Sequence, residues 1–377
     1  MRPARRLRLE SRVVPGTRRG SSLTMSTDGS RPRAIVALEE VRGDVRAAVR
    51  RALEAVDFRA ALPAGAPVAL KVNLGWDLFI PGSITSPQVV EALVLELREH
   101  VGPLCVVEAD QVLEDIEHAA RASGMLELCE RLGIRWINMT GEPTVPVEAP
   151  ENRVLRRIDV PRILTEARLV TVPVMKTHAK TGLSGALKNQ WGCLPTMRHA
   201  YHPVLDDAIA DLNHLLRPAL ALMDGTVGLE GNGPKSGRPR IADRILCSTD
   251  PVALDTIQAI VMGLDPQRVR HIVRAAERGI GTNERARIEV RGLVPERTVV
   301  PFRPARHNAV SRVETVLRAS ALRRLVFDTP LFRACLLGAK LYYRIWTVLV
   351  APYVWRKVLD HPLYGPIWRG RRPGPRA

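Results

Sequence analysis

Residues 176–189, KTHAKTGLSGALKN, combine three lysines and a histidine with small residues. Glycines let a ligand approach the backbone, and free N–H groups at a helix start favour anions, so this segment could hold a phosphate or a carboxylate. Lys176 and His178 are candidate catalytic groups. The candidate ligand-binding residues of the segment are Thr177, Thr181, Gly182, Lys188 and Asn189. Neither a Walker nor a Rossmann glycine pattern occurs, so an ordinary strand-to-helix turn with surface lysines stays as the alternative.

A second candidate segment, DGTVGLEGNGP, runs from position 224 to position 234. Its four glycines and its proline predict a loop of unusual backbone geometry. Asp224 and Glu230 could act as acid and base or bind a divalent metal ion, and Gly231 and Asn232 could bind a cofactor or substrate. A surface loop with an Asx turn would account for the same residues.

Three histidines near these segments, His178, His199 and His202, keep a metal-binding or proton-transfer role open. Each histidine alone is more often a hydrogen-bonded structural residue. Asp250 directly precedes Pro251, which predicts a helix cap. Asp255, one turn further along that helix, could face either the loop edge of the sheet or solvent.

Short apolar runs alternate with helical patterns from residue 33 onward. This alternation is typical of an α/β fold with a mostly parallel open sheet and helices on both faces. The predicted strands are 34–38, 67–72, 104–108, 135–138, 167–174, 219–223, 244–247 and 287–290. The predicted helices are 42–55, 87–100, 116–132, 183–190, 204–215, 251–262 and 266–278.

Polar residues follow five of these strands directly. Ligands of open α/β sheets bind outside the carboxyl ends of the strands, so these groups would converge at one edge if the strands share a sheet. Asn73 therefore joins the candidate cofactor-binding residues. The full set is Lys71, Asn73, Glu108, Asp110, Lys176, Thr177, His178, Asp224, Ser248, Thr249 and Asp250.

The net charge of +17 is concentrated at the two ends of the 377 residues. Residues 1–33 carry nine arginines against two acids, and residues 303–377 carry fifteen lysines and arginines against three acids, so residues 34–302 have a net charge of −2. A near-neutral centre argues against a nucleic-acid-binding domain. We expect three parts: a basic disordered segment (1–33), an α/β domain (34–302) and a basic helical C-terminal tail (303–377).

The C-terminal stretch 331–358 mixes aromatic and aliphatic side chains with lysine and arginine. This composition suits a partly amphipathic helix in the interface of an anionic membrane, or one packed on the domain or on a second subunit. The sequence contains no run of 18 uncharged apolar residues and no secretory signal. We therefore expect a cytoplasmic protein that the tail could hold at the inner face of a membrane.

Three segments, MKTHAKTGLSGALKNQWGCLP, MDGTVGLEGNGP and STDPVALDTIQAIVMGLDP, resemble hallmark stretches of the domain-of-unknown-function 362 family (DUF362). TSPQVVEAL resembles the family's N-terminal portion, and the likeness covers about residues 67 to 281. The resemblance marks Lys176, Thr177, His178, Lys188, Asn189, Asp224, Gly225, Glu230, Gly231, Asn232, Asp250, Pro251 and Asp255 as motif residues.

Many members of the family carry a ferredoxin-like iron–sulfur module, which implies redox work. The five cysteines of this chain, Cys105, Cys129, Cys193, Cys247 and Cys335, form no C-x-x-C pair, so no iron–sulfur motif can be written from them. Electron transfer would then need a separate iron–sulfur partner. A divalent metal ion is the cofactor that the acidic residues suggest.

These observations predict an enzyme that binds an anionic small molecule or cofactor, with or without a metal ion, at the carboxyl ends of the strands. Two alternatives stay open. One is a non-catalytic ligand-binding or scaffold protein at a membrane surface, and the other is a redox component that acts with an iron–sulfur partner.

Overall fold

The computed structural model describes residues 34–75, 80–111, 115–194, 201, 203–233, 236–305 and 331–369, and a few positions between 316 and 329. The segment 1–33 that was predicted to be disordered lies outside the described residues, as do His199 and His202. Residues from Arg33 to the end of the chain group into one compact unit.

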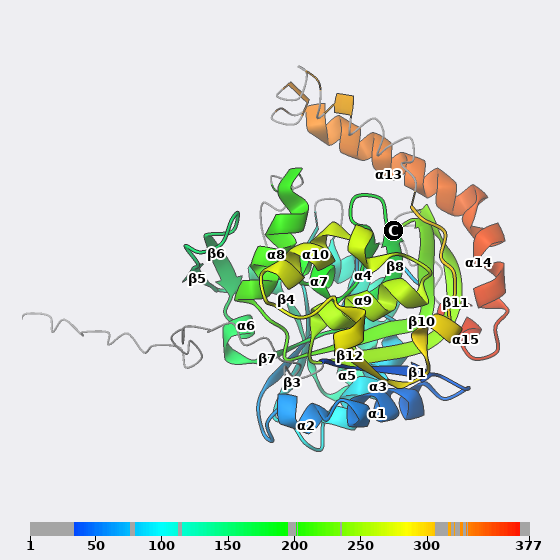
Figure 1. The fold of residues 1–377 in the computed structure, drawn as a ribbon. Coiled ribbons are helices and arrows are strands. Elements are labelled where there is room, and N and C mark those ends of the chain that lie inside the picture. Colours follow the sequence, from blue (N-terminus) through cyan, green and yellow to red (C-terminus); the bar gives the residue numbers. More distant parts are fainter. Residues whose placement is uncertain are drawn as a thin grey trace, which may run out of the picture. The chain divides into compact units, whose positions relative to one another are not determined.

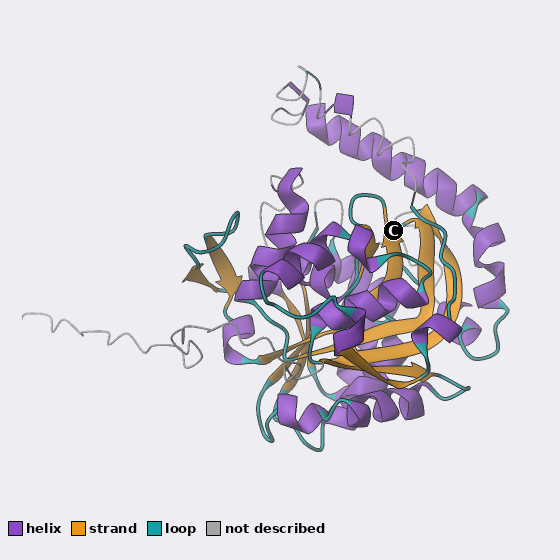
Figure 2. Cartoon of the chain, viewed as in Figure 1, coloured by secondary structure: helices purple, strands orange, loops and turns teal. Residues whose placement is uncertain are grey.

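A large sheet runs through this unit, and its strands lie between two sets of helices (Figure 1, Figure 2). The strand order is β12, β1, β11, β10, β7, β2, β3, β4. All neighbouring pairs in this order are parallel except the two that β11 makes with β1 and β10, so the predicted mostly parallel sheet is confirmed. The bounds are β1 Ala34–Glu40, β2 Val68–Lys71, β3 Leu104–Glu108, β4 Arg135–Asn138, β7 Arg168–Thr171, β10 Leu220–Asn232, β11 Ser236–Ser248 and β12 Ile288–Gly292.

Helices cover both faces of the sheet. Successive side chains of a strand point to opposite faces, so both sets of side chains are buried. Val68 and Leu70 of β2 join the apolar cluster formed with helices α1, α3, α4 and α5, whereas Ala69 joins the cluster that contains α8. Helix α9 covers β1, β10 and β11 on the second face. The bounds are α1 Val45–Ala55, α3 Pro87–Leu97, α4 Ile116–Ser123, α5 Met125–Leu132, α8 Leu205–Leu215, α9 Pro251–Val261 and α10 Arg270–Glu277.

Helix ends follow the local sequence closely. The Asp250 carboxylate accepts hydrogen bonds from the backbone N–H groups of Val252 and Ala253, which confirms the predicted cap of α9. The single helix predicted over 116–132 is wrong, because Gly124 adopts a φ of +75° and divides it into α4 and α5. A small antiparallel pair, β5 (Thr144–Glu148) with β6 (Arg157–Pro161), was not predicted.

The glycine-rich segment after Asp224 is not a loop. It continues β10 as far as Asn232 and pairs antiparallel with β11, with an irregularity between Gly225 and Val227. Glycine is needed there for close packing, since a Cβ on Gly228 would overlap the carbonyl oxygen of Met175 and lie 2.7 Å from the Phe302 ring. The predicted loop is therefore wrong, because pairing with β11 satisfies backbone groups that a loop would leave to solvent.

The carboxyl end of β11 lies at the opposite edge of the sheet from the other predicted strand ends. In the antiparallel register, Ser248 stands beside Ala221 at the start of β10, whereas Arg244 stands beside Gly225. Ser248, Thr249 and Asp250 therefore do not join the groups that follow β2 and β3, and the prediction that all five strand ends converge is wrong.

The lysine-rich segment also differs from its prediction. Strand β8 (Val174–His178) runs beside β10, turns at Gly182 and returns as β9 (Gly182–Ser184). Only the four-residue helix α7 (Ala186–Asn189) follows, where a helix over 183–190 was predicted.

The described C-terminal helices are α13 (Leu331–Leu349), α14 (Ala351–Leu359) and α15 (Gly365–Arg369). Tyr364 and Trp368 belong to the same buried cluster as α1 and α3, so this end of the predicted tail is part of the domain's core. Among the described residues, no helix is long and apolar enough to cross a membrane.

Candidate functional site

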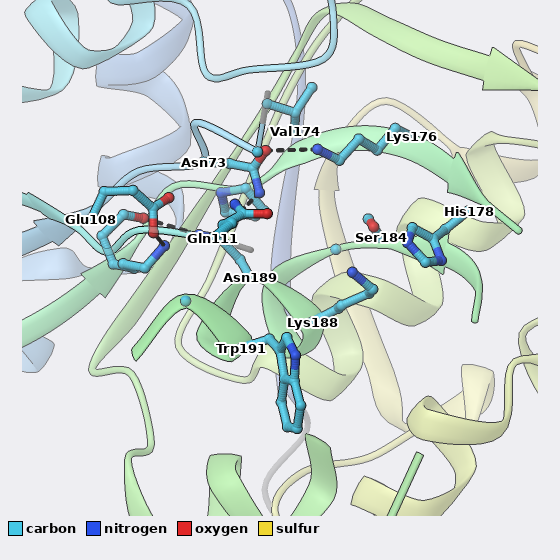
Figure 3. Close-up of a pocket in the computed structure, with 15 residues that line it drawn as sticks. Asn73, Glu108, Gln111, Val174, Lys176, His178, Ser184, Lys188, Asn189 and Trp191 are labelled. Atoms are coloured by element: carbon cyan, nitrogen blue, oxygen red, sulfur yellow. Dashed lines mark hydrogen bonds and ion pairs between the residues drawn. The ribbon is translucent and has the colours of Figure 1, made fainter. Parts of the chain in front are cut away.

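A cavity of about 70 Å³ lies where β2, β3 and β8 end and α7 begins (Figure 3). Three lysines, one histidine and one glutamate are among its lining groups, together with polar amides and Trp191. The lining residues are Lys71, Asn73, Gly75, Glu108, Gln111, Pro173, Val174, Lys176, His178, Ser184, Gly185, Lys188, Asn189, Trp191 and Gly192.

Strand β8 supplies every second residue to this cavity. Val174, Lys176 and His178 line it, whereas Thr177 points away and donates a hydrogen bond from Oγ1 to the carbonyl oxygen of Gly231 (3.0 Å). This is the alternation that any strand imposes. Thr177, a candidate cofactor-binding residue, is thus a structural contact between β8 and β10.

The Lys176 ammonium group is buried, with 3% of the residue exposed. Its Nζ donates to the Asn73 Oδ1 (2.6 Å) and to the carbonyl oxygen of Ser83 (2.9 Å). Figure 3 shows the Lys176 and Lys188 side chains on either side of the same space, with His178 beside them. The two lysines come from different elements, β8 and α7.

Two asparagines link Lys176 to the strands below it. The Asn73 Nδ2 donates to the Asn189 Oδ1 (2.9 Å), and the Asn189 Nδ2 donates to the carbonyl oxygen of Lys71 (3.0 Å) and to the Thr171 Oγ1 (2.9 Å). A chain of hydrogen bonds of this kind fixes the rotamers of its members. Asn73 and Asn189, both predicted to bind a cofactor, hold Lys176 in place from the cavity wall.

A buried ion pair stands at the β2–β3 side of the cavity. The Lys71 Nζ lies 2.6 Å from the Glu108 Oε1, and each side chain is only 1% exposed. The backbone N–H groups of Leu74 and Ala109 also donate to this carboxylate. Gly192 lies against the pair, since a Cβ there would approach both charged atoms to 2.5 Å. The pair is therefore neutral overall and closely enclosed.

His178 is fixed in one tautomer. Its Nδ1 accepts hydrogen bonds from the backbone N–H groups of Lys180 (3.1 Å) and Thr181 (3.3 Å), so the proton of the neutral ring is on Nε2. Burial, and next the charges of Lys188, Lys176 and Lys180, hold the pKa of His178 well below its ordinary value. His178 is thus a neutral N–H donor rather than a cation.

The start of α7 does not offer free N–H groups to an anion, contrary to the prediction. The backbone N–H groups of Ala186 and Leu187 donate to the Asp255 carboxylate at 2.6 and 3.0 Å. Asp255 is fully buried and faces this loop edge of the sheet rather than solvent. Burial raises the pKa of Asp255 to about 7, against the effect of these two hydrogen bonds.

Asp224 and Glu230 do not line the cavity, although the backbone N–H of Asp224 donates to the carbonyl oxygen of the lining residue Pro173 (2.8 Å). The Asp224 carboxylate accepts from the N–H of Ser86 (2.7 Å) and from Thr226, and burial raises its pKa to about 6. The Glu230 carboxylate accepts from the N–H of Arg303 (3.1 Å). Within the described part of the chain, no group of three or more His, Cys, Asp and Glu side chains could hold a metal ion.

The remaining candidates of the two segments shape turns. Gly182 and Gly231 have φ angles of +76° and +77°, which favour glycine, and the Thr181 Oγ1 donates to the carbonyl oxygen of Leu183 (2.9 Å). Asn232 ends β10, and like these three residues it is outside the cavity lining.

Among the lining residues with polar or aromatic side chains, the sequence reasoning missed three: Gln111, Ser184 and Trp191. Gln111 follows Asp110 at the β3 strand end, so position alone could have suggested it. Ser184 and Trp191 sit within and just after the lysine-rich segment, but no spacing rule marks them. Lys71 and Glu108 were recognised as strand-end groups, although their pairing was not foreseen.

Residues 68–259 match the family model described as Domain of unknown function (DUF362). The chain belongs to this family. The DUF362 region contains every lining residue of the cavity. The resemblance noted from the three sequence segments is therefore confirmed.

Two comparisons with individual proteins extend this result. The chain is 26% identical over 212 residues to a thylakoid-associated protein of Synechocystis sp., an alignment that covers 54% of this chain and 64% of the relative. The DUF362 chain thus matches less than two thirds of that relative's length. A solved structure, the lactate racemase apoprotein from Thermoanaerobacterium thermosaccharolyticum, aligns with a TM-score of 0.36 at 13% identity, over 64% of this chain and 60% of the other.

Proposed function

We propose that the chain is an enzyme that binds the anionic group of a small molecule or cofactor in the cavity beside Lys176. One observation carries the proposal: two lysines and a neutral histidine donor line a cavity whose one described carboxylate, Glu108, is already paired with Lys71. The lining side chains therefore have a formal charge of +2. An anionic group would be complementary to this charge in a partly buried site.

The arrangement supports catalysis as well as binding. Lys176 is held by Asn73 and the carbonyl oxygen of Ser83, so it does not need to reorganise when a ligand arrives. Fixed donors of this kind stabilise negative charge that develops on an oxygen atom in a transition state. The site thus fits reactions in which a carboxylate, phosphate or enolate oxygen gains charge.

A matched pair of lysine variants tests the binding step. Lys188 lines the cavity, whereas Lys180 carries the same charge on the exposed turn between β8 and β9. Isothermal titration calorimetry with sulfate and with inorganic phosphate measures the affinity for an anion. Lys188→Ala should lower this affinity by about tenfold or more, because a charge-assisted hydrogen bond is lost. Lys180→Ala should change the affinity by no more than about twofold. Equal losses in both variants, or no anion binding by the wild type, would refute the proposal.

The identity of the natural ligand can be read from the protein as purified. Native mass spectrometry, metal analysis and absorption spectra of wild type and Lys176→Ala, prepared without oxygen, should show a bound small molecule in the wild type that the variant lacks. Incubation of that molecule with the wild type should convert it, and Lys176→Ala should not. A ligand that is bound but never converted would favour the non-catalytic alternative, and a visible chromophore would favour the redox role with an iron–sulfur partner.

A further inference from the structure

The described apolar side chains of helix α13 lie on two faces, one of which packs on the domain. Tyr343 is 5% exposed and forms a buried cluster with Ile80 and Leu229. Trp346 of α13 and Trp355 of α14 pack against the same cluster. This inner face accounts for the attachment of the helix.

The outer face of α13 is an exposed apolar stripe. Its members recur at spacings of three and four residues, which places them along one side of a helix. Such contiguous exposure is unusual for a soluble surface and marks an interaction site. The stripe consists of Leu337 (68% exposed), Leu341 (61%), Ile345 (50%), Val348 (71%) and Leu349 (70%). Tyr353 of α14, 89% exposed, follows it.

All the charged residues of α13 are basic. The sequence of α13 contains Arg333, Lys340 and Arg344 and no acidic residue. Across residues 331–369 six lysines and arginines face one acid, Asp360. Arg344 beside the stripe is exposed, as are Arg356 and Lys357 on α14.

We propose that the outer face of α13 is a docking surface for an anionic membrane, with the helix lying in the plane of the headgroups. An apolar stripe with cations beside it fits this environment, because the stripe enters the acyl boundary while the cations meet lipid phosphates. Figure 1 shows α13 on the outside of the domain, apart from helices α1, α3 and α9, which cover the sheet.

A second copy of the chain is the competing occupant, and charge disfavours it. A symmetric pair of α13 helices would bring the cations of one copy against those of the other, with no acid on either helix to compensate. An anionic lipid surface supplies the missing opposite charge. The lipid surface therefore satisfies both features of the helix, whereas a second copy satisfies only the apolar one.

Cosedimentation of the full chain with vesicles tests the proposal. The vesicles consist of phosphatidylcholine with about one lipid in four replaced by phosphatidylglycerol, because an anionic lipid attracts cations at the membrane surface. Leu341→Glu and Val348→Glu should each lower the vesicle partition coefficient by about tenfold or more, because a large apolar side chain leaves the lipid. Arg344→Glu should lower it by at least about fivefold, and added salt should weaken wild-type binding.

The matched control is Val294→Glu, which places the same charge on another exposed apolar residue (48% exposed) outside α13. It should bind vesicles as the wild type does. Two results would overturn the proposal: equal partition of Leu341→Glu and Val294→Glu, or equal wild-type binding to anionic vesicles and to pure phosphatidylcholine. Sedimentation velocity that shows a wild-type dimer and a monomeric Leu341→Glu variant would assign the stripe to a second copy instead.

Discussion

The segment 176–192 and the glycine-rich half of β10 look alike in the sequence, yet they do different work in the structure. Both mix glycines with charged and polar residues. The first places Lys176, His178 and Lys188 around a cavity, whereas the second uses its glycines for close strand packing. Glycine beside polar residues therefore indicates that another group lies close to the backbone. The tertiary structure decides whether that group is a ligand or another part of the protein.

An ion pair beside each of these regions shows the same contrast. Lys71 and Glu108 at the cavity are each 1% exposed. Arg303 and Glu230 at the end of β10 lie 3.6 Å apart, and the arginine side chain is 72% exposed. Water thus cannot screen the ion pair at the cavity, whereas it screens the pair at the end of β10.

The largest expected effect comes from breaking the buried pair. Lys71→Met should lower the free energy of unfolding by about 3–5 kcal/mol, because Glu108 is left as an uncompensated buried charge. The same substitution at the exposed pair, Arg303→Met, should cost less than about 1 kcal/mol. Urea unfolding followed by circular dichroism measures both.

A double variant separates the charge from the packing of that pair. Lys71→Met combined with Glu108→Gln removes both charges, so much of the lost stability should return. If Lys71→Met alone proves no more costly than Arg303→Met, the buried pair is not what distinguishes the cavity region.

Two glycines sharpen the comparison at intermediate cost. Gly228→Ala should lower the free energy of unfolding by about 1–3 kcal/mol, because its Cβ would overlap the Met175 carbonyl group and the Phe302 ring. Gly75→Ala should change stability by less than about 0.5 kcal/mol, since its Cβ meets no atom of the described residues closer than 3.6 Å. The new methyl group would instead stand in the cavity, 3.9 Å from the Lys176 Nζ, and weaken sulfate binding. Unchanged sulfate affinity in Gly75→Ala would show that the anion binds elsewhere.

The most gradual expected effect is a pH dependence at Asp255, which caps α7 from α9. Burial raises the pKa of Asp255 from 3.8 to about 7, so the folded state keeps a proton that the unfolded state loses. Wild-type stability should therefore fall relative to Asp255→Asn as the pH rises from about 4 to about 7, by at most about 1.4 kcal/mol per pH unit. A pH-independent difference between the two proteins in thermal or urea unfolding would contradict this.

Much of the local structure could be predicted because it depends on neighbours in the chain. The bounds of β3 and β4, and the cap of α9 by Asp250, follow from apolar runs and from a cap residue followed by proline. The predictions failed where a distant partner decided the outcome. β10 extends through its glycines because β11 pairs with it, and α7 loses its anion-binding start because Asp255 caps it from 68 to 69 positions away.

The sequence by itself determined the mostly parallel sheet, the strand-end chemistry of Lys71, Asn73, Glu108 and Lys176, and the concentration of charge at the two ends. Only the tertiary structure decided which of these groups meet. Lys176 and Asn73 are 103 positions apart, and their contact depends on strand order and on which face of β8 each side chain occupies. The physical reason is that a strand's pattern fixes the alternation of its side chains, whereas long-range backbone pairing fixes where each face points.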